Sequence, residues 1–412
     1  MTVDALPRAP SRAAKISRSD PMFWRVNAPV FVGGFATFDV LYCVQPLMPV
    51  FSRDFAISPA EASLSLSMTT GLLAAGLLAA GAVADAFGRK RTMAISLAAT
   101  AVATTLAAFA PNWPTFLALR ALAGLALSGL PAVAMAYLAD ELDPPALGLA
   151  MGLYIAGNTV GGMAGRLAAA ALSDLYGWRP AIATVSVVGF FGAAMIAWGL
   201  PAKRGFTPRP LDARRLVATL MRHLADPGLR LLFAEGFLLL GVFVCAYNYL
   251  GFRLAAPPFS YSQTAIGLLF VIYIVGATSS VTMGTLASRY GRRRVMWIAI
   301  AIVMAGVAVT LPDNIVAIVL GAGLITWGFS GGHSIASSWV GLRAERARAY
   351  AAALYLFFFY VGSAVTGAAG GLFFARGGWP AVAALLAAMT GLALWVALRL
   401  SKVPPPRHLQ PR

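Results

Sequence analysis

The stretch that decides the fold of this chain is GAVADAFGRKR, residues 81–91, which lies between two long apolar runs. A close copy, GTLASRYGRRR, occupies residues 284–294, which is 203 positions later. In each copy an apolar segment ends near a glycine, and a cluster of Arg and Lys follows. Cytoplasmic loops of membrane proteins carry an excess of these cations. The two copies therefore indicate a membrane protein built from two homologous halves.

The composition supports a membrane protein over a soluble one. The chain has 412 residues, of which 59% are hydrophobic and 11% are charged. Soluble domains carry roughly 25% charged residues, so lipid must cover much of this surface. In a membrane protein, the excess of Lys and Arg behind the net charge of +17 marks the loops on the cytoplasmic side. We therefore expect no nucleic-acid partner. Two cysteines and three histidines form no disulfide framework or metal-ligand pattern. We expect no metal, no other cofactor and no enzymatic activity.

Segments of about 20 mostly apolar residues can cross a bilayer as helices. The sequence predicts twelve, so the fold class is an all-α membrane protein with two pseudo-symmetric six-helix bundles. The predicted spans are 27–50, 61–84, 92–110, 115–138, 147–172, 179–200, 229–252, 263–287, 295–311, 315–340, 349–375 and 380–400. The predicted parts are an N-terminal tail, a first bundle, a basic linker, a second bundle and a C-terminal tail. Their bounds are 1–26, 27–200, 201–228, 229–400 and 401–412.

Three local patterns refine these spans. Ser58 and Glu61 form a capping box that opens the second span. Pro46 and Pro49 are expected to kink the end of the first span. Residues 212–224 of the basic linker are expected to form an interfacial helix.

The distribution of positive charge predicts the orientation. With the N-terminus inside, 26 of the 32 Lys and Arg residues fall in segments on that side. Both termini are therefore expected in the cytoplasm. The basic clusters also suit the anionic lipids of the inner leaflet.

An internal repeat runs through the chain at offsets of 201–203 residues. The matched residues are Gly34-Phe35 with Gly236-Phe237, Tyr154 with Tyr355, and Gly177-Trp178 with Gly378-Trp379. Such a repeat is typical of two parallel bundles related by an axis along the membrane normal, with the substrate bound between them near the midplane.

Four charged residues lie inside predicted spans. Asp39 is about a dozen residues into its helix, which places it near the midplane at ~1.5 Å per residue. Charge there is costly, so a role in proton exchange or substrate binding is the default interpretation; a hydrogen-bonded structural role in a wet cavity is the alternative. Arg120 is expected to interact with a carboxylate or with the substrate, or to extend toward the outer interface. Arg166 follows closely packed glycines and is expected to pair with Asp39 or to contact an anionic substrate. Glu235 is either a second proton site or an ion-pair partner.

The two halves differ in their polar residues. At the repeat-equivalent positions, Asp39, Arg120 and Arg166 become Gly241, Ala322 and Gly367. We therefore expect the N-terminal half to carry proton coupling and the aromatic-rich C-terminal half to line the cavity, although such aromatics also pack helices together. His333 is a candidate proton relay or a helix–helix hydrogen bond. The residues expected around the substrate are Asp39, Tyr154, Asn158, Arg166, Tyr247, Tyr273, Trp327, His333 and Tyr355.

These motifs resemble the major facilitator superfamily, in its twelve-helix drug:H⁺ antiporter branch. The resemblance covers the whole chain. Its loop signature is carried by Gly81, Asp85, Gly88, Arg89 and Lys90, and its helix-4 signature by Arg120 and Gly124. The helix-5 antiporter signature resembles residues 157–162, with Asn158 where that signature has proline. The second copy of the loop adds Gly284, Gly291 and Arg292.

The resemblance implies a bacterial inner-membrane carrier. It ties Arg120 to proton coupling and the two loops to gating, with Asp85 near the helix that starts at about Ala349 when the cytoplasmic side is closed. We expect a monomer that moves protons and exports a small organic compound such as a drug, sugar or metabolite. The alternatives are uptake of a sugar or organic anion by symport or uniport, and a membrane enzyme or receptor.

Overall fold

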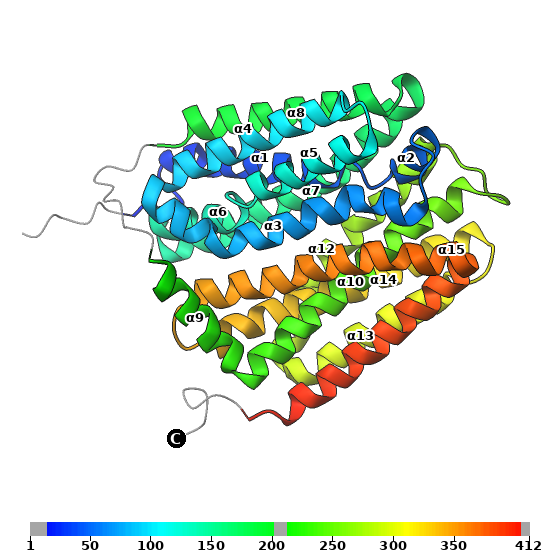
Figure 1. The fold of residues 1–412 in the computed structure, drawn as a ribbon. Coiled ribbons are helices and arrows are strands. Elements are labelled where there is room, and N and C mark those ends of the chain that lie inside the picture. Colours follow the sequence, from blue (N-terminus) through cyan, green and yellow to red (C-terminus); the bar gives the residue numbers. More distant parts are fainter. Residues whose placement is uncertain (1–14, 202–211, 405–412) are drawn as a thin grey trace, which may run out of the picture.

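The computed structural model describes residues 15–201 and 212–404. The ends of the predicted tails, 1–14 and 405–412, and the centre of the linker, 202–211, lie outside the described residues. In the described residues the regular secondary structure is helical, apart from one isolated bridge that pairs Ile16 with Leu142. Figure 1 shows the helices running side by side between two ends of the molecule.

Twelve helical segments run the length of the molecule, as predicted. Among the described residues, nine helices are long and apolar enough to cross a bilayer. One of them, α15 (Arg348–Lys402), bends at Gly377 and Gly378 and so crosses twice. Two further helices of similar length, α1 (Met22–Tyr42) and α13 (Arg292–Val309), complete the set.

The remaining helices follow the predicted order. In the first half they are α2 (Met48–Asp54), α3 (Pro59–Phe87), α4 (Arg89–Ala108), α5 (Trp113–Leu127), α6 (Pro131–Glu141), α7 (Pro144–Tyr176) and α8 (Trp178–Ala194), which continues into the π-helical turn Met195–Gly199. The linker holds α9 (Ala213–Ala225), close to its predicted position. In the second half they are α10 (Pro227–Ala255), α11 (Gln263–Leu268), the 3₁₀ turn Leu269–Ile272, α12 (Tyr273–Tyr290) and α14 (Ile315–Arg343).

The chemistry at the helix ends explains several of these bounds. The capping box is present: Ser58 Oγ accepts from the Glu61 amide, and the Glu61 carboxylate accepts from the Ser58 amide. The two glycine–basic loops have the same geometry, because Gly88 and Gly291 both have φ of 90°. Side chains avoid that region, and glycine enters it freely. The repeated glycines are therefore needed for the repeated turn.

Two predicted spans are broken. In the first the break lies where Pro46 and Pro49 were expected to kink the helix, whereas the break in the second was not predicted. Helix α1 ends at Tyr42, and residues 43–47 form turns before α2 begins. Pro46 lies in these turns and Pro49 is in the first turn of α2, a position that needs no backbone donor. The predicted span 115–138 is split into α5 and α6 by turns at residues 128–130, immediately before Pro131.

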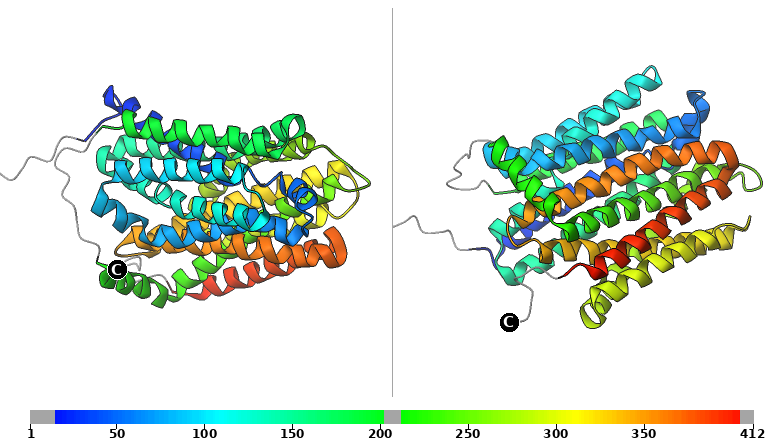
Figure 2. Two further views of the ribbon diagram at one scale, coloured as in Figure 1. Left: turned by 45° about the horizontal axis from the view of Figure 1, so that its top comes forward. Right: turned by 60° about the horizontal axis from the view of Figure 1, so that its bottom comes forward.

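The same close packing occurs in both halves. Gly161 of α7 lies against the Phe35 carbonyl of α1, with no room for a Cβ atom between the helices. Its repeat mate Gly362 lies in the same way against the Phe237 carbonyl of α10. Small residues allow such close approach of membrane helices. Figure 2 shows the same helices from two further directions.

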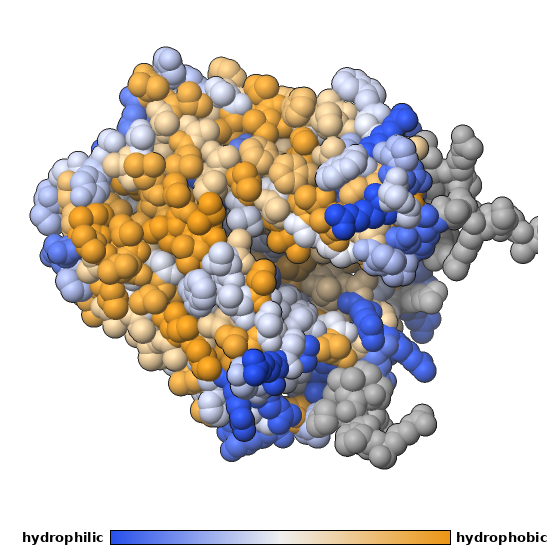
Figure 3. Space-filling view, turned by 180° about the vertical axis from the view of Figure 1, so that it is seen from behind, coloured by the Kyte–Doolittle hydropathy of each residue, from blue (hydrophilic) through white to orange (hydrophobic). Residues whose placement is uncertain are grey.

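The two halves enclose a cleft that opens at one end only. We call that end the terminal face, since α9, the glycine–basic loops and both ends of the described chain, Lys15 and Pro404, lie there (Figure 1). We call the opposite end the distal face. Figure 3 shows a hollow between the halves that opens at the terminal face. At the distal face the halves touch: Gly371 of α15 packs against the Ala60 backbone of α3. The molecule is therefore in a terminal-open state.

Candidate functional site

The closed end of the cleft is crossed by a chain of three polar side chains. Arg166 of α7 donates from Nε to Gln45 Oε1 at 2.7 Å. Gln45, in the break after α1, then donates to Asn248 Oδ1 of α10 at 2.8 Å. All three are buried. Gln45 and Asn248 come from different halves and are 203 residues apart, which is the offset of the internal repeat. These hydrogen bonds therefore join the two bundles at a place where repeat-related segments meet.

Arg166 is held in an aromatic cage. Its guanidinium carbon lies 4.1 Å from the ring centroid of Tyr42, 4.9 Å from that of Phe270 and 4.8 Å from that of Tyr273. It also donates to the Gly162 carbonyl at 2.6 Å. Rings stabilise a desolvated cation through their negative faces. Of the expected roles, pairing with Asp39 is not seen in this state, since the hydrogen bonds of Arg166 go to Gln45 and Gly162.

Arg120 stabilises the broken end of α1. It is 0% exposed and donates to three carbonyls, those of Val40 at 3.4 Å, Leu41 at 2.9 Å and Ser65 at 3.3 Å. The last carbonyls of a helix lack partners within the helix, and a cation there also suits the helix dipole. Arg120 therefore does not extend to the outer interface.

The glycine of the Arg-x-x-x-Gly motif brings Arg120 into place. A Cβ atom at Gly124 would meet the backbone of Thr69 on α3. The absence of a side chain lets α5 approach α3 closely. Arg120, one turn earlier on α5, then reaches Ser65 and the end of α1.

Asp39 lies one turn before that end. It is 3% exposed, and its Oδ2 atom has no hydrogen-bond partner among the described residues. Its backbone packs against Gly165 of α7, where a Cβ atom would stand 2.5 Å from the Asp39 carbonyl oxygen. A buried carboxylate without partners is strongly disfavoured, so this site favours the neutral acid in the terminal-open state.

The C-terminal half holds a second buried carboxyl group. Glu235 of α10 is 0% exposed, and neither of its carboxyl oxygens has a hydrogen-bond partner among the described residues. Tyr355 of α15 lies within electrostatic range of it, and the Tyr355 hydroxyl is 2.9 Å from His333 Nδ1 of α14. The sequence predicted these three residues separately, and the fold brings them together. Glu235 has no ion pair here, so that alternative is not seen.

The other predicted cavity residues are divided between the two halves. Tyr154 donates to the Pro131 carbonyl at 3.4 Å and lies with Asn158 against Gly34. Tyr247 is hydrogen-bonded to Thr326 Oγ1 at 2.7 Å. These contacts belong to helix packing inside each bundle. Tyr273 joins the cage of Arg166, whereas Trp327 is half-buried.

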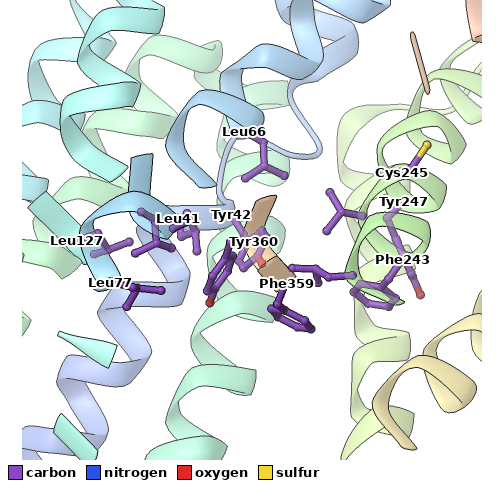
Figure 4. Close-up of a cluster of buried hydrophobic side chains, with 14 of the residues drawn as sticks. Leu41, Tyr42, Leu66, Leu77, Leu127, Phe243, Cys245, Tyr247, Phe359 and Tyr360 are labelled. Atoms are coloured by element: carbon purple, nitrogen blue, oxygen red, sulfur yellow. The ribbon is translucent and has the colours of Figure 1, made fainter. Parts of the chain in front are cut away.

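Sequence reasoning included Tyr247 and Tyr360 in the aromatic lining but missed Tyr42, which lies at the boundary of the halves. Figure 4 shows Tyr42 of α1 beside Tyr360 of α15, with Leu41 and Leu66 on one side and Phe243 and Tyr247 on the other. Gln45 and Asn248 were also missed. A usable signal existed, since a polar residue beside Pro46 and another at the repeat-related offset mark the point where the first helices of the halves meet.

The first gating loop is anchored within its own half. Arg89 pairs with Asp140 at 2.7 Å and more loosely with Asp85 at 3.9 Å, and Lys90 donates to the Leu200 carbonyl. Asp85 is 46% exposed. Among the described residues no hydrogen bond or ion pair links Asp85 to the first turn of α15.

The second gating loop lacks the carboxylate of the first. Ser288 stands at the position of Asp85, and Arg293 donates to the Val403 carbonyl at 3.0 Å. Gly81 and Gly284 leave ample room beside them, and Arg292 is half-buried. Of the loop glycines, Gly88 and Gly291 are the two whose backbone requires glycine.

A carboxylate latches the distal face. Asp174, near the end of α7, accepts hydrogen bonds from the Gln263 amide at 3.1 Å, the Thr264 amide at 2.7 Å and the Thr264 hydroxyl at 2.6 Å. These donors lie in the first turn of α11, in the other half. An anion at a helix N-terminus is favoured by its free amides and its dipole. Asp174 therefore holds the two halves together at the closed face.

Comparison with known proteins identifies the family. The family model described as Major Facilitator Superfamily matches residues 30–259 and 238–412. The chain belongs to the major facilitator superfamily. It is 43% identical to the uncharacterized MFS-type transporter YybF of Bacillus subtilis, over 94% of this chain and 96% of that protein. It is 42% identical to the inner membrane transport protein YnfM of Escherichia coli, over 97% and 98%.

Solved structures agree with this superfamily fold. A variant of the nucleoside transporter NupG matches with a TM-score of 0.76 at 16% identity, covering 92% of this chain and all of that chain. A bacterial homologue of the lysosomal transporter Spinster, in an inward-facing and unoccupied conformation, matches with a TM-score of 0.74 at 16% identity, covering 94% and 100%. The protein is thus a multi-pass MFS secondary transporter of a small-molecule substrate and not an enzyme.

Proposed function

We propose that this MFS transporter exports a small organic compound across the bacterial inner membrane in exchange for protons. The two bundles rock about the central cleft and open it to one side at a time. The observation that carries the proposal is Asp39, which is buried at the closed end of the cleft with an unpartnered carboxyl oxygen. Such a group holds a proton in one state and releases it when the surroundings change.

Arg120 supports this role from a short distance along α1. Its hydrogen bonds fix the carbonyls of Val40 and Leu41, the residues that follow Asp39. In this proposal, closure of the terminal face also shifts α1 relative to this cation. A cation that comes nearer to Asp39 favours the ionised carboxylate. The same movement would then release the proton as the cargo site changes sides.

The terminal face is proposed to be cytoplasmic. It carries the clustered Arg and Lys residues of both glycine–basic loops, which are expected on the inside, and it would face anionic lipid. The structure is then inward-open. The similar Spinster homologue was solved inward-facing, and the similar YnfM is an inner membrane protein. A single chain holds the whole cleft, so we propose a monomer.

A second candidate is uptake of an organic anion by proton symport. It rests on Arg166, whose guanidinium lies at the closed end of the cleft between three rings. If an anionic cargo displaced Gln45 from Arg166, it would also break the link to Asn248 and so loosen the distal face.

A counterflow screen tests the proposal. Proteoliposomes loaded with candidate compounds are mixed with trace labelled compound at two pH values, with wild-type protein and Asp39→Asn. We expect counterflow of a cargo in both proteins and a weaker pH dependence in Asp39→Asn than in the wild type. Equal pH dependence in both proteins would show that Asp39 has no role in proton coupling.

A further inference from the structure

Glu235, Tyr355 and His333 come from three helices of the C-terminal half and meet away from Asp39. Glu235 is completely buried, Tyr355 is 2% exposed, and His333 is half-buried. The exposed fraction of the side chain therefore increases from Glu235 through Tyr355 to His333. The Tyr355 ring packs on α10 beside Glu235, since a Cβ atom at Gly236 would lie 2.7 Å from Tyr355 Cε2.

The surroundings of Glu235 leave its charge uncompensated. Tyr355 of α15 is the titratable group that lies within electrostatic range of Glu235 among the described residues. His333 of α14 contacts Tyr355 rather than Glu235, and its ring centroid lies 4.5 Å from that of Phe359 of α15. Phe359 is seen at the boundary of the halves in Figure 4. The charged residue before it on α10, Arg230, is exposed at the helix start. An ionised carboxyl group buried without a partner is strongly disfavoured.

The equivalent place in the N-terminal half has the tyrosine without the acid. Tyr154 is the repeat mate of Tyr355, Pro131 that of His333, and Gly33 that of Glu235. Tyr154 donates to the Pro131 carbonyl, and the space beside Gly33 is filled by Ile196 and Leu130. Both halves therefore have a tyrosine at this repeat position, but only in the second half are its neighbours, Glu235 and His333, titratable.

We infer that Glu235 stores a proton in the terminal-open state and releases it to the cleft through Tyr355 and His333. This inference rests on the proposed proton coupling and adds a second proton to it, separate from that of Asp39. Glu235 and Tyr355 are not hydrogen-bonded in this structure, so the path is interrupted between them. A side-chain rotation of Glu235 toward the hydroxyl completes it.

The transfer is balanced in protons. Glu235 gives its proton to the Tyr355 oxygen, while the Tyr355 hydroxyl proton moves to His333 Nδ1. His333 must therefore begin neutral with its proton on Nε2, and it ends by releasing the Nε2 proton to water in the cleft. One proton leaves the protein, Glu235 becomes a carboxylate, and Tyr355 is unchanged.

Infrared spectroscopy of the full-length protein in lipid tests the storage step without any cargo. A protonated carboxyl group that lacks a hydrogen bond has a carbonyl stretch at high frequency. We expect this band at neutral pH in wild-type protein and in Asp39→Asn, where Asp39 cannot contribute to it, and we expect its loss in the double variant Asp39→Asn/Glu235→Gln. If the wild-type protein lacks the band, Glu235 is ionised and the inference is overturned, whether or not any variant folds.

Exchange into D₂O tests the path, because deuteration shifts the same band. We expect Tyr355→Phe and His333→Gln to slow the shift by about tenfold or more, since exchange then waits for local opening. Tyr154→Phe, the matched change in the other half, should leave the rate unchanged. Equal rates in wild-type and Tyr355→Phe proteins overturn the path. Failure of the proposed transport, by contrast, would appear as absent proton movement with cargo, which this experiment does not measure.

Discussion

At the scale of single residues, the buried arginines have a structural task that constrains their function. Arg120 satisfies three carbonyls at the point where α1 breaks. Arg120→Ala takes a donor from each carbonyl. The Leu41 carbonyl loses its side-chain donor, at a cost of about 1–3 kcal/mol, whereas the Val40 and Ser65 carbonyls still accept from the Cys43 thiol and the Thr69 hydroxyl. We predict a lower thermal unfolding temperature in detergent for this variant. Arg120→Lys should recover part of the loss, because an ammonium is a compact charge without the guanidinium fork. If Arg120→Ala unfolds at the wild-type temperature, Arg120 does not stabilise the end of α1.

Asp226 gives a prediction for pH. Burial alone would raise the pKa of this carboxyl group. Hydrogen bonds from Arg343 at 2.6 and 3.1 Å and from the Leu229 amide at 2.7 Å have the larger effect, so the pKa lies below its ordinary value. The carboxylate therefore stabilises the folded state above its unfolded pKa of about 3.9, and the contribution is lost as pH falls through the folded pKa.

Thermal unfolding from neutral to acidic pH checks this contribution. Asp226→Asn should be less stable than wild type at neutral pH, and the two curves should converge in acid. A constant difference at every pH would contradict the prediction.

At the scale of helices, glycine contacts set the distance between α1 and α7. Gly161 has no room for a Cβ atom against the Phe35 carbonyl, whereas Gly152 on the same helix has open space. Overpacking of this kind costs typically about 1–3 kcal/mol. We therefore predict that Gly161→Ala lowers the unfolding temperature and that Gly152→Ala does not. The repeat mate Gly362 should behave as Gly161 does, and a tolerated Gly362→Ala would contradict the equivalence of the two contacts.

The helices could be predicted from the sequence to a large extent, because length and hydropathy decide membrane crossing. A kink at the end of the first span could be predicted from Pro46 and Pro49. The break at residues 128–130, immediately before Pro131, was missed. The sequence likewise identified Asp39, Arg166 and Glu235 as unusual, since charge inside a span is rare. It could not give their partners, because Gln45, Tyr42 and Tyr355 meet them only after the bundles assemble.

At the scale of the whole molecule, the distal face must open and close during transport. Asp174 links α7 to the first turn of α11 through three hydrogen bonds. Hydrogen bonds to charged groups contribute about 1.5–3 kcal/mol each, and ~1.4 kcal/mol changes a population ratio tenfold. We predict that Asp174→Asn shifts the population toward a distal-open state.

Spin labels measure this shift. One pair at Arg53 and Arg376 spans the halves at the distal face, and a second at Arg91 and Arg294 spans them at the terminal face. In Asp174→Asn the distal distance should lengthen as the terminal distance shortens. Asp54→Asn is the control, since Asp54 bonds Trp178 within one half. Equal distance distributions in the wild type and Asp174→Asn would show that Asp174 is no latch.

The central claim is that cargo and protons move through one cleft in opposite directions. A pH electrode in a weakly buffered suspension of proteoliposomes measures this directly when a cargo found by counterflow is added outside. The account predicts that the medium becomes more acidic, because protons leave the vesicles as cargo enters, and that the signal is smaller in Asp39→Asn, which lacks the proton carried by Asp39. A shift toward alkaline pH would indicate symport, and a wild-type signal equal to that of empty vesicles would contradict proton coupling altogether.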